Sequence, residues 1–136
     1  MGLLDRISEM AGRALRPVRA GEGRLASAQL RDESSATIPL ESTSFTSGGP
    51  IPATYSDSEG ENVSPGLRWS DVPSGTRELV LLCEDPDIPM RDPFVHWVLY
   101  GIAPDVREIP EGVGREERPV GAKQGRNTVR KYGYMG

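Results

Sequence analysis

Two short apolar segments limit what this chain can fold into. Residues 79–83 are an unbroken apolar run, and residues 94–102 are rich in aromatic and β-branched side chains. Segments of this length are typical of strands, and the first is expected to be a strand buried on both faces. The 16 glycines and 12 prolines among 136 residues favour turns over long helices.

Weaker strand signals precede these two segments. Residues 37–45 carry apolar side chains among hydroxyl residues, and Leu67 and Trp69 alternate with polar residues, which predicts a short strand with a buried tryptophan. Almost no helical periodicity separates these segments, so we predict an all-β antiparallel sandwich or barrel. The length is that of one domain with a single core.

The N-terminal part has a different texture. Apolar residues recur there at three- and four-residue spacing with arginines between them, which predicts an amphipathic helix over residues 1–17 that ends at Pro17. Such a helix covers a sheet or a partner subunit, or lies on an anionic membrane. The short length and the lack of an aromatic anchor favour the first reading. Residues 18–36 are predicted to be a linker, and residues 37–136 the domain.

Composition and charge exclude several classes of protein. A net charge of −4 argues against nucleic-acid binding, which needs a basic face. The chain has no apolar run of about 18 residues and no apolar core of a signal peptide. Its single cysteine, Cys83, cannot form an intrachain disulfide and lies among apolar residues. We therefore predict a cytoplasmic protein.

The strongest candidate for a polar site is the segment Asp85-Pro86-Asp87-Ile88-Pro89, a short loop away from His96, the only histidine. Prolines restrict the backbone of such a loop, so its carboxylates lose little entropy when they are held in place. Protonated His96 could hold an anion such as phosphate, although the carboxylates oppose this. The alternative is structural: Asp-Pro pairs form turns, and a lone histidine on a strand often bonds a backbone carbonyl.

Other chemistries find less support. One histidine, one thiol and scattered carboxylates provide no spaced set of metal ligands. Cys83 lies within an apolar run and there is no Gly-x-Ser-x-Gly elbow, so an activated nucleophile is not expected. We predict neither an enzyme nor a cofactor.

Further motifs, read in order, resemble those of one family. The segments are Ile51-Pro52 with Tyr55, Gly60-x-Asn62-x-Ser64-Pro65-x-Leu67-x-Trp69, Val72-Pro73, the Asp-Pro-Asp loop, residues 94–100, Gly121, Gly125-Arg126-Asn127 and Gly133-Tyr134. Their order and spacing over residues 38–136 resemble the bacterial and archaeal branch of the phosphatidylethanolamine-binding proteins, also called the Raf-kinase-inhibitor-like family, which includes the YbhB/YbcL-like proteins.

The resemblance implies a β-sandwich with a small pocket at one edge that accepts anionic groups. By position, Asp85, Asp87, Ile88 and Pro89 correspond to its loop wall, His96 to its imidazole and Phe94 to its rim. The expected function is a non-catalytic protein that binds a phosphate-like anion or a phospholipid head group. The alternative is an interaction module that inhibits a protease or kinase, with a structural pocket. The sequence is also compatible with a homodimer.

The sequence departs from the family pattern in two ways. Ile88 stands where alanine is commoner, which is expected to narrow the pocket. The sequence given also ends at Gly136, before the Pro-Cys-Pro-Pro segment and the Gly-x-x-His-Arg-Tyr motif that the family pattern contains. We therefore expect a fragment that carries half of the pocket and is marginally stable alone, unless the N-terminal helix or another chain covers the gap in its core.

Overall fold

The computed structural model describes residues 19–30 and 36–136, and the predicted helix over residues 1–17 lies outside them. The described residues fall into two compact units, which are treated separately below: residues 19–30 with Glu84–Phe94, and residues 36–83 with Val95–Gly136. Within this described part, no helix is both long enough and apolar enough to cross a bilayer.

One sheet contains three short strands, β1 (Leu40–Ser42), β2 (Leu67–Trp69) and β5 (Glu108–Ile109), in the order β1-β2-β5. Both pairings are antiparallel, with Leu40 opposite Trp69 and Leu67 opposite Ile109. The strand predicted at Leu67 and Trp69, with its buried tryptophan, is therefore confirmed.

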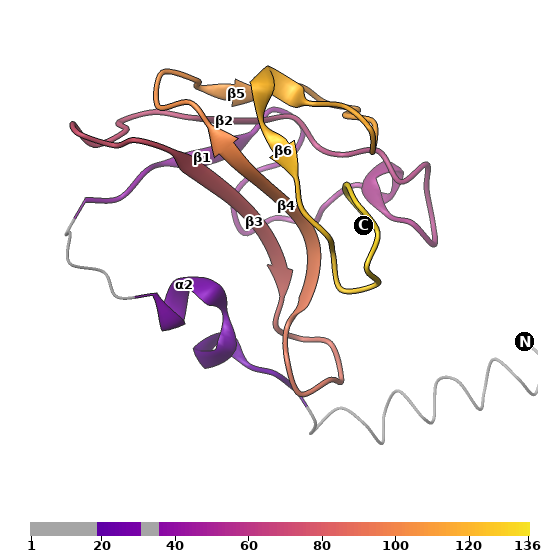
Figure 1. Ribbon diagram of the computed structural model, residues 1–136. Helices are drawn as coiled ribbons and strands as arrows, with labels where there is room; N and C mark the ends of the chain where they lie inside the picture. Colours follow the sequence, from indigo (N-terminus) through magenta and orange to yellow (C-terminus); the bar gives the residue numbers. More distant parts are fainter. Residues whose placement is uncertain (1–18, 31–35) are drawn as a thin grey trace, which may run out of the picture. The chain divides into compact units, whose positions relative to one another are not determined.

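The second sheet contains β3 (Leu79–Asp85), β4 (Phe94–Ile102) and β6 (Lys123–Gln124), in the order β3-β4-β6. Figure 1 shows the long strands β3 and β4 running side by side. The pairing of β4 with β6 is antiparallel and places Tyr100 opposite Lys123. Successive side chains of a strand point to opposite faces, and on β4 this directs Trp97 and Leu99 into the core.

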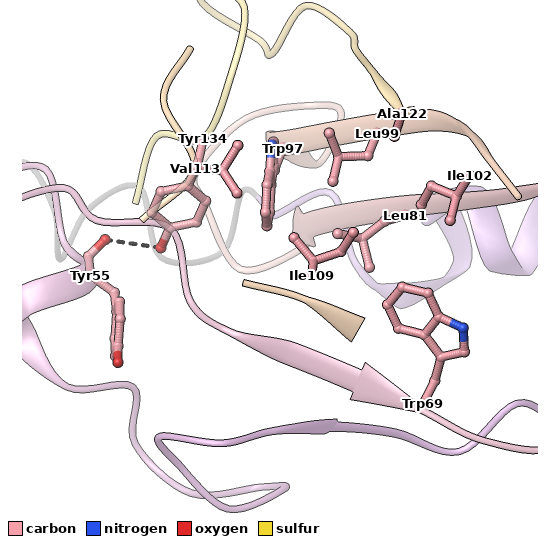
Figure 2. Close-up of a cluster of buried hydrophobic side chains, with 10 residues drawn as sticks. All are labelled: Tyr55, Trp69, Leu81, Trp97, Leu99, Ile102, Ile109, Val113, Ala122 and Tyr134. Atoms are coloured by element: carbon pink, nitrogen blue, oxygen red, sulfur yellow. Dashed lines mark hydrogen bonds between the residues drawn. The ribbon is translucent and has the colours of Figure 1, made fainter. Parts of the chain in front are cut away.

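The core lies where both sheets contribute buried side chains. Figure 2 shows Trp69 and Ile109 of one sheet facing Leu81 and Trp97 of the other. Leu99, Ile102, Trp97 and Ile109 are each at most 1% exposed. The predicted all-β fold of two antiparallel sheets is thus confirmed. The remaining members of the cluster are Tyr55, Val113, Ala122 and Tyr134.

Two strand predictions need correction. β3 is not buried on both faces, because Val80 is 57% and Leu82 40% exposed while Leu81 between them is 8% exposed. This alternation is that of a strand with one covered face. The strand predicted over residues 37–45 is shorter, since only Leu40–Ser42 pairs. The strand ends at Ser42, whose hydroxyl donates to the Gly66 carbonyl and accepts a hydrogen bond from the Ser44 backbone N–H.

The region predicted as a linker contains two single helical turns, η1 (Glu22–Arg24) and α2 (Ala26–Gln29). Two further turns lie in the loops of the other unit, η2 (Ala53–Tyr55) and η3 (Pro119–Gly121). The first of these contributes to the candidate site, because it buries Tyr55.

Candidate functional site

The carboxylates of the Asp-Pro-Asp loop bond locally within the first unit. Asp85 is the last residue of β3, and its Oδ1 accepts a hydrogen bond of 2.8 Å from the Asp87 backbone N–H. Asp87 is exposed and forms an ion pair of 2.9 Å with Arg19. Ile88 is half-buried, Pro89 is exposed, and the Ile88 carbonyl accepts from the Met90 N–H. The loop therefore forms the kind of turn that Asp-Pro pairs are expected to form.

Residues 19–30 hold the loop from the other side of the same unit. The Gly21 N–H donates to the Pro86 carbonyl at 3.1 Å, and the Ala26 N–H donates to the Glu84 carboxylate at 3.0 Å. The Ala26 bond supplies an acceptor to the first turn of α2, which has no side-chain cap of its own.

His96, the third residue of β4, is half-buried in the second unit. Its Nδ1 bonds the Met135 carbonyl, and the Met135 N–H donates to the His96 carbonyl at 3.0 Å. A carbonyl only accepts, so Nδ1 carries the proton. In the neutral ring Nε2 then has the lone pair, and a protonated ring would present a second N–H there.

A cavity of about 180 Å³ lies beside His96. Its volume is several times the roughly 30 Å³ that a water molecule occupies in the liquid, so a group the size of a phosphate fits. All the residues around it belong to the second unit, and they combine apolar side chains with an imidazole, a thiol and phenol rings: Ile51, Pro52, Tyr55, Ser56, Cys83, His96, Tyr134 and Gly136.

The two tyrosines that line the cavity are held uncharged by their surroundings. The Tyr134 hydroxyl donates to the Tyr55 carbonyl at 2.9 Å, as Figure 2 shows. Burial raises the pKa of Tyr134 to about 12, and the charges of Cys83 and Tyr55 add to the effect. The hydroxyl of Tyr55 donates to Glu111 at 2.6 Å, which raises the pKa of Tyr55. Both phenols are therefore neutral hydrogen-bond donors at physiological pH.

A tight turn brings Tyr134 to this cavity. Asn127 is 5% exposed, and its side chain accepts from the Lys131 N–H and donates to the Gly133 carbonyl. Beside it, a Cβ on Gly125 would come within 2.8 Å of the Val98 side chain. The Gly-Arg-Asn motif therefore acts through geometry: it lets the chain turn and lie against β4.

A second motif fixes the other side of the same segment. Asn62, in the left-handed region with φ of 54°, accepts from the Gly136 N–H at 2.9 Å through its Oδ1. Ser64 is 2% exposed, and its hydroxyl accepts from the Val113 N–H at 2.8 Å. Two polar residues of the Gly-x-Asn-x-Ser-Pro motif thus hold backbone that lines or supports the cavity.

Of the six residues predicted for the pocket, His96 alone is among those that line this cavity. Asp85, Asp87, Ile88, Pro89 and Phe94 belong to the first unit, where Phe94 is the half-buried first residue of β4. Their grouping with His96 around one ligand stays a prediction. The prediction did not include Tyr55, Cys83 and Tyr134, although both tyrosines lie in the motifs that carry the resemblance.

Metal binding finds no support in the described part of the chain, where no three histidine, cysteine or carboxylate side chains come together. The cavity that His96 lines is also lined by a thiol and two phenols. The chemistry available at this cavity is therefore hydrogen bonding and, when His96 is protonated, attraction of negative charge.

Comparison with known proteins places this geometry in context. The sequence pattern of the family described as "Phosphatidylethanolamine-binding protein" matches residues 41–136. The UPF0098 protein of Aquifex aeolicus is 40% identical over 101 residues, which are 74% of this chain and 58% of the Aquifex protein. The UPF0098 protein YbhB of Escherichia coli is 41% identical over 80 residues, 57% of this chain and 51% of YbhB.

The fold agrees with a solved structure as well. The crystal structure of Escherichia coli YbcL, described as a new member of the mammalian PEBP family, superposes with a TM-score of 0.68 at 32% identity. The match covers 74% of this chain and 66% of YbcL. This chain thus spans between about half and two thirds of the length of the relatives it matches.

Proposed function

Because the chain belongs to the phosphatidylethanolamine-binding protein family, we propose that it is a non-catalytic binding protein that holds a small anion, of the phosphate or phospholipid head-group type, in the cavity beside His96. The observation that carries the proposal is the bond from Nδ1 to the Met135 carbonyl. It fixes the ring, and because Nδ1 carries the proton of this bond, Nε2 is the ring nitrogen on the other side. A protonated Nε2 is a charge-assisted donor to an anion.

The surroundings of His96 support a binding role. The Tyr134 and Tyr55 hydroxyls are uncharged and donate to the Tyr55 carbonyl and to Glu111, so the two phenols add no negative charge to the lining of the cavity. We place the activity in binding rather than in turnover.

A titration with inorganic phosphate tests the proposal. The chain has one histidine, so labelled histidine gives one set of ring resonances in NMR spectra. We expect these to move saturably at millimolar phosphate. Phosphoethanolamine in place of phosphate distinguishes a head-group site from a free-phosphate site. Ring resonances that stay in place with both ligands would contradict the proposal.

A matched pair of variants tests whether the Asp-Pro-Asp loop takes part in anion binding. Asp87 and Asp92 each form an exposed ion pair with an arginine, at 2.9 and 3.0 Å, and both carboxylates are 74% exposed. If Asp87 faces the bound anion, Asp87→Asn removes a repulsion and tightens phosphate binding, while Asp92→Asn leaves it unchanged. Equal affinities in the two variants would remove the loop from the site.

The alternative is an interaction module that inhibits a protease or kinase. It would be favoured if His96→Gln abolished phosphate binding, followed in this variant through backbone amide resonances, but left capture of a protein partner unchanged. The same variant then separates the two functions in one preparation. Loss of both responses in a folded His96→Gln protein would place partner binding at the cavity as well.

A further inference from the structure

A second cavity, of about 140 Å³, lies where the two sheets of the sandwich open. It is bordered by β1 and β3, which are the first strands in the orders β1-β2-β5 and β3-β4-β6. Its lining is apolar apart from one indole: Ile38, Leu40, Trp69, Leu79, Val80, Leu81 and Ile102. None of these residues lines the cavity beside His96, so the two cavities are independent.

The indole is the one side chain of the lining that carries a hydrogen-bond donor. Trp69 is 8% exposed, and its buried Nε1–H has no acceptor within the described residues. Figure 2 shows the nitrogen on the side of the indole away from Leu81 and Ile109. Leaving a buried donor without an acceptor costs about 1–3 kcal/mol.

The other tryptophan shows the usual arrangement. Trp97 is 1% exposed, and its Nε1–H donates to Gln124 Oε1 at 2.9 Å. The Gln124 amide in turn donates to the Gly114 carbonyl at 2.7 Å. The same chain thus satisfies one buried indole and leaves the other without an acceptor beside an apolar cavity. Buried polar groups without partners are rare in native structures, so each one requires a physical explanation.

From this pair of observations we propose that the cavity beside Trp69 binds a small, neutral, apolar molecule with one acceptor oxygen, which accepts from the Trp69 indole. The apolar lining excludes a charged ligand, because an ion would lose its hydration there without a counter-charge. A cavity of roughly 150 Å³ is large enough for a six-membered ring. A cyclic ketone has these properties and serves as the probe.

Entry to the cavity lies at the rim. Leu40 is 49% and Ile38 37% exposed, so both side chains border solvent. Exposed side chains change rotamer within nanoseconds, so we expect an occupant to enter by displacing these two side chains.

The experiment compares two ligands of the same shape, cyclohexanone and methylenecyclohexane, in NMR spectra of the protein labelled at its two tryptophans. Trp97→Phe assigns the two indole resonances. We expect cyclohexanone to move the Trp69 indole proton downfield in a saturable way and to leave that of Trp97 in place. Methylenecyclohexane, which has no oxygen, should bind without the downfield shift. Its affinity should be weaker by about threefold to tenfold, the worth of one neutral hydrogen bond.

Three outcomes would overturn the proposal. The first is a Trp69 indole proton that does not respond to millimolar cyclohexanone. The second is an equal response to both ligands. The third is a Trp69 proton that already lies, without ligand, as far downfield as that of Trp97, which would mean that an acceptor is present in the free protein.

Two exposed leucines provide a control for the place of binding. Leu40→Phe enlarges a side chain at the rim and should abolish the cyclohexanone response. Leu30→Phe makes the same change at a residue that is 69% exposed and does not line the cavity, and should preserve it. Loss of the response in both variants, or in neither, would place binding elsewhere.

Discussion

Removing the Tyr134 hydroxyl should destabilise the fold, and the loss should depend on pH. In Tyr134→Phe the ring keeps its edge-to-face contact with Trp97, whose centroid is 5.7 Å away. The Tyr55 carbonyl, however, loses the donor that lies 2.9 Å from it in a buried setting. We expect a loss of about 1–2 kcal/mol in the free energy of unfolding at neutral pH.

The pH dependence follows from the same hydroxyl. Its pKa rises from 10.0 to about 12 on folding, chiefly because of burial, so the folded protein keeps a proton that the unfolded chain has lost. The stabilisation is therefore complete below pH 10 and disappears as pH rises towards 12. The slope is at most about 1.4 kcal/mol per pH unit, and solvent near the ring reduces the total change to about 1–2 kcal/mol.

The assay is denaturant unfolding of the parent protein and of Tyr134→Phe at neutral pH and at intervals above pH 10. The difference in unfolding free energy should shrink towards zero as the pH approaches 12. Tyr132→Phe is the control, because Tyr132 is 49% exposed and should show no difference at any pH. A parent and a Tyr134→Phe variant whose difference stays constant through this range would refute the reasoning.

Three further substitutions test the framework. Gly60→Ala should destabilise the protein by about 2 kcal/mol or more in denaturant unfolding, because its Cβ would overlap the Ala53 carbonyl; an unchanged midpoint would contradict the close approach. Gln124→Leu should lower the free energy of unfolding by about 1–3 kcal/mol, since it leaves the buried Trp97 indole without an acceptor. The Trp97 indole proton should then move upfield in NMR spectra. Asp87→Asn should change stability by less than about 1 kcal/mol, as its ion pair is exposed; a larger loss would show a further role.

The sequence predicts those strands that are long enough for their own side chains to form a recognisable strand pattern. β4 matches its predicted bounds because six of its nine residues are aromatic or β-branched. β5 and β6 could not be predicted, since each is two residues long and has no periodicity to read. The error on β3 has the same origin: an unbroken apolar run does not reveal which of its faces is covered.

The site was predictable only in part, because its contacts join distant residues. The hydroxyl of Tyr134 reaches a carbonyl 79 positions earlier, and Met135 bonds His96 across 39 positions. No local pattern indicates such contacts. The resemblance did identify the segments that make them, but it could not show that Tyr134 lines the same cavity as His96.

The family motifs are therefore stronger evidence for a cavity than for its ligand. Asn62 and Asn127 spend their side-chain bonds on backbone, and Asp85 bonds within its own turn. A residue that holds backbone keeps the shape of a site whatever the site binds. His96 is different, because its Nδ1 bond orients a ring that itself lines the cavity. Substitutions at the two asparagines should consequently lower stability and binding together, whereas His96→Gln should lower anion binding with little loss of stability.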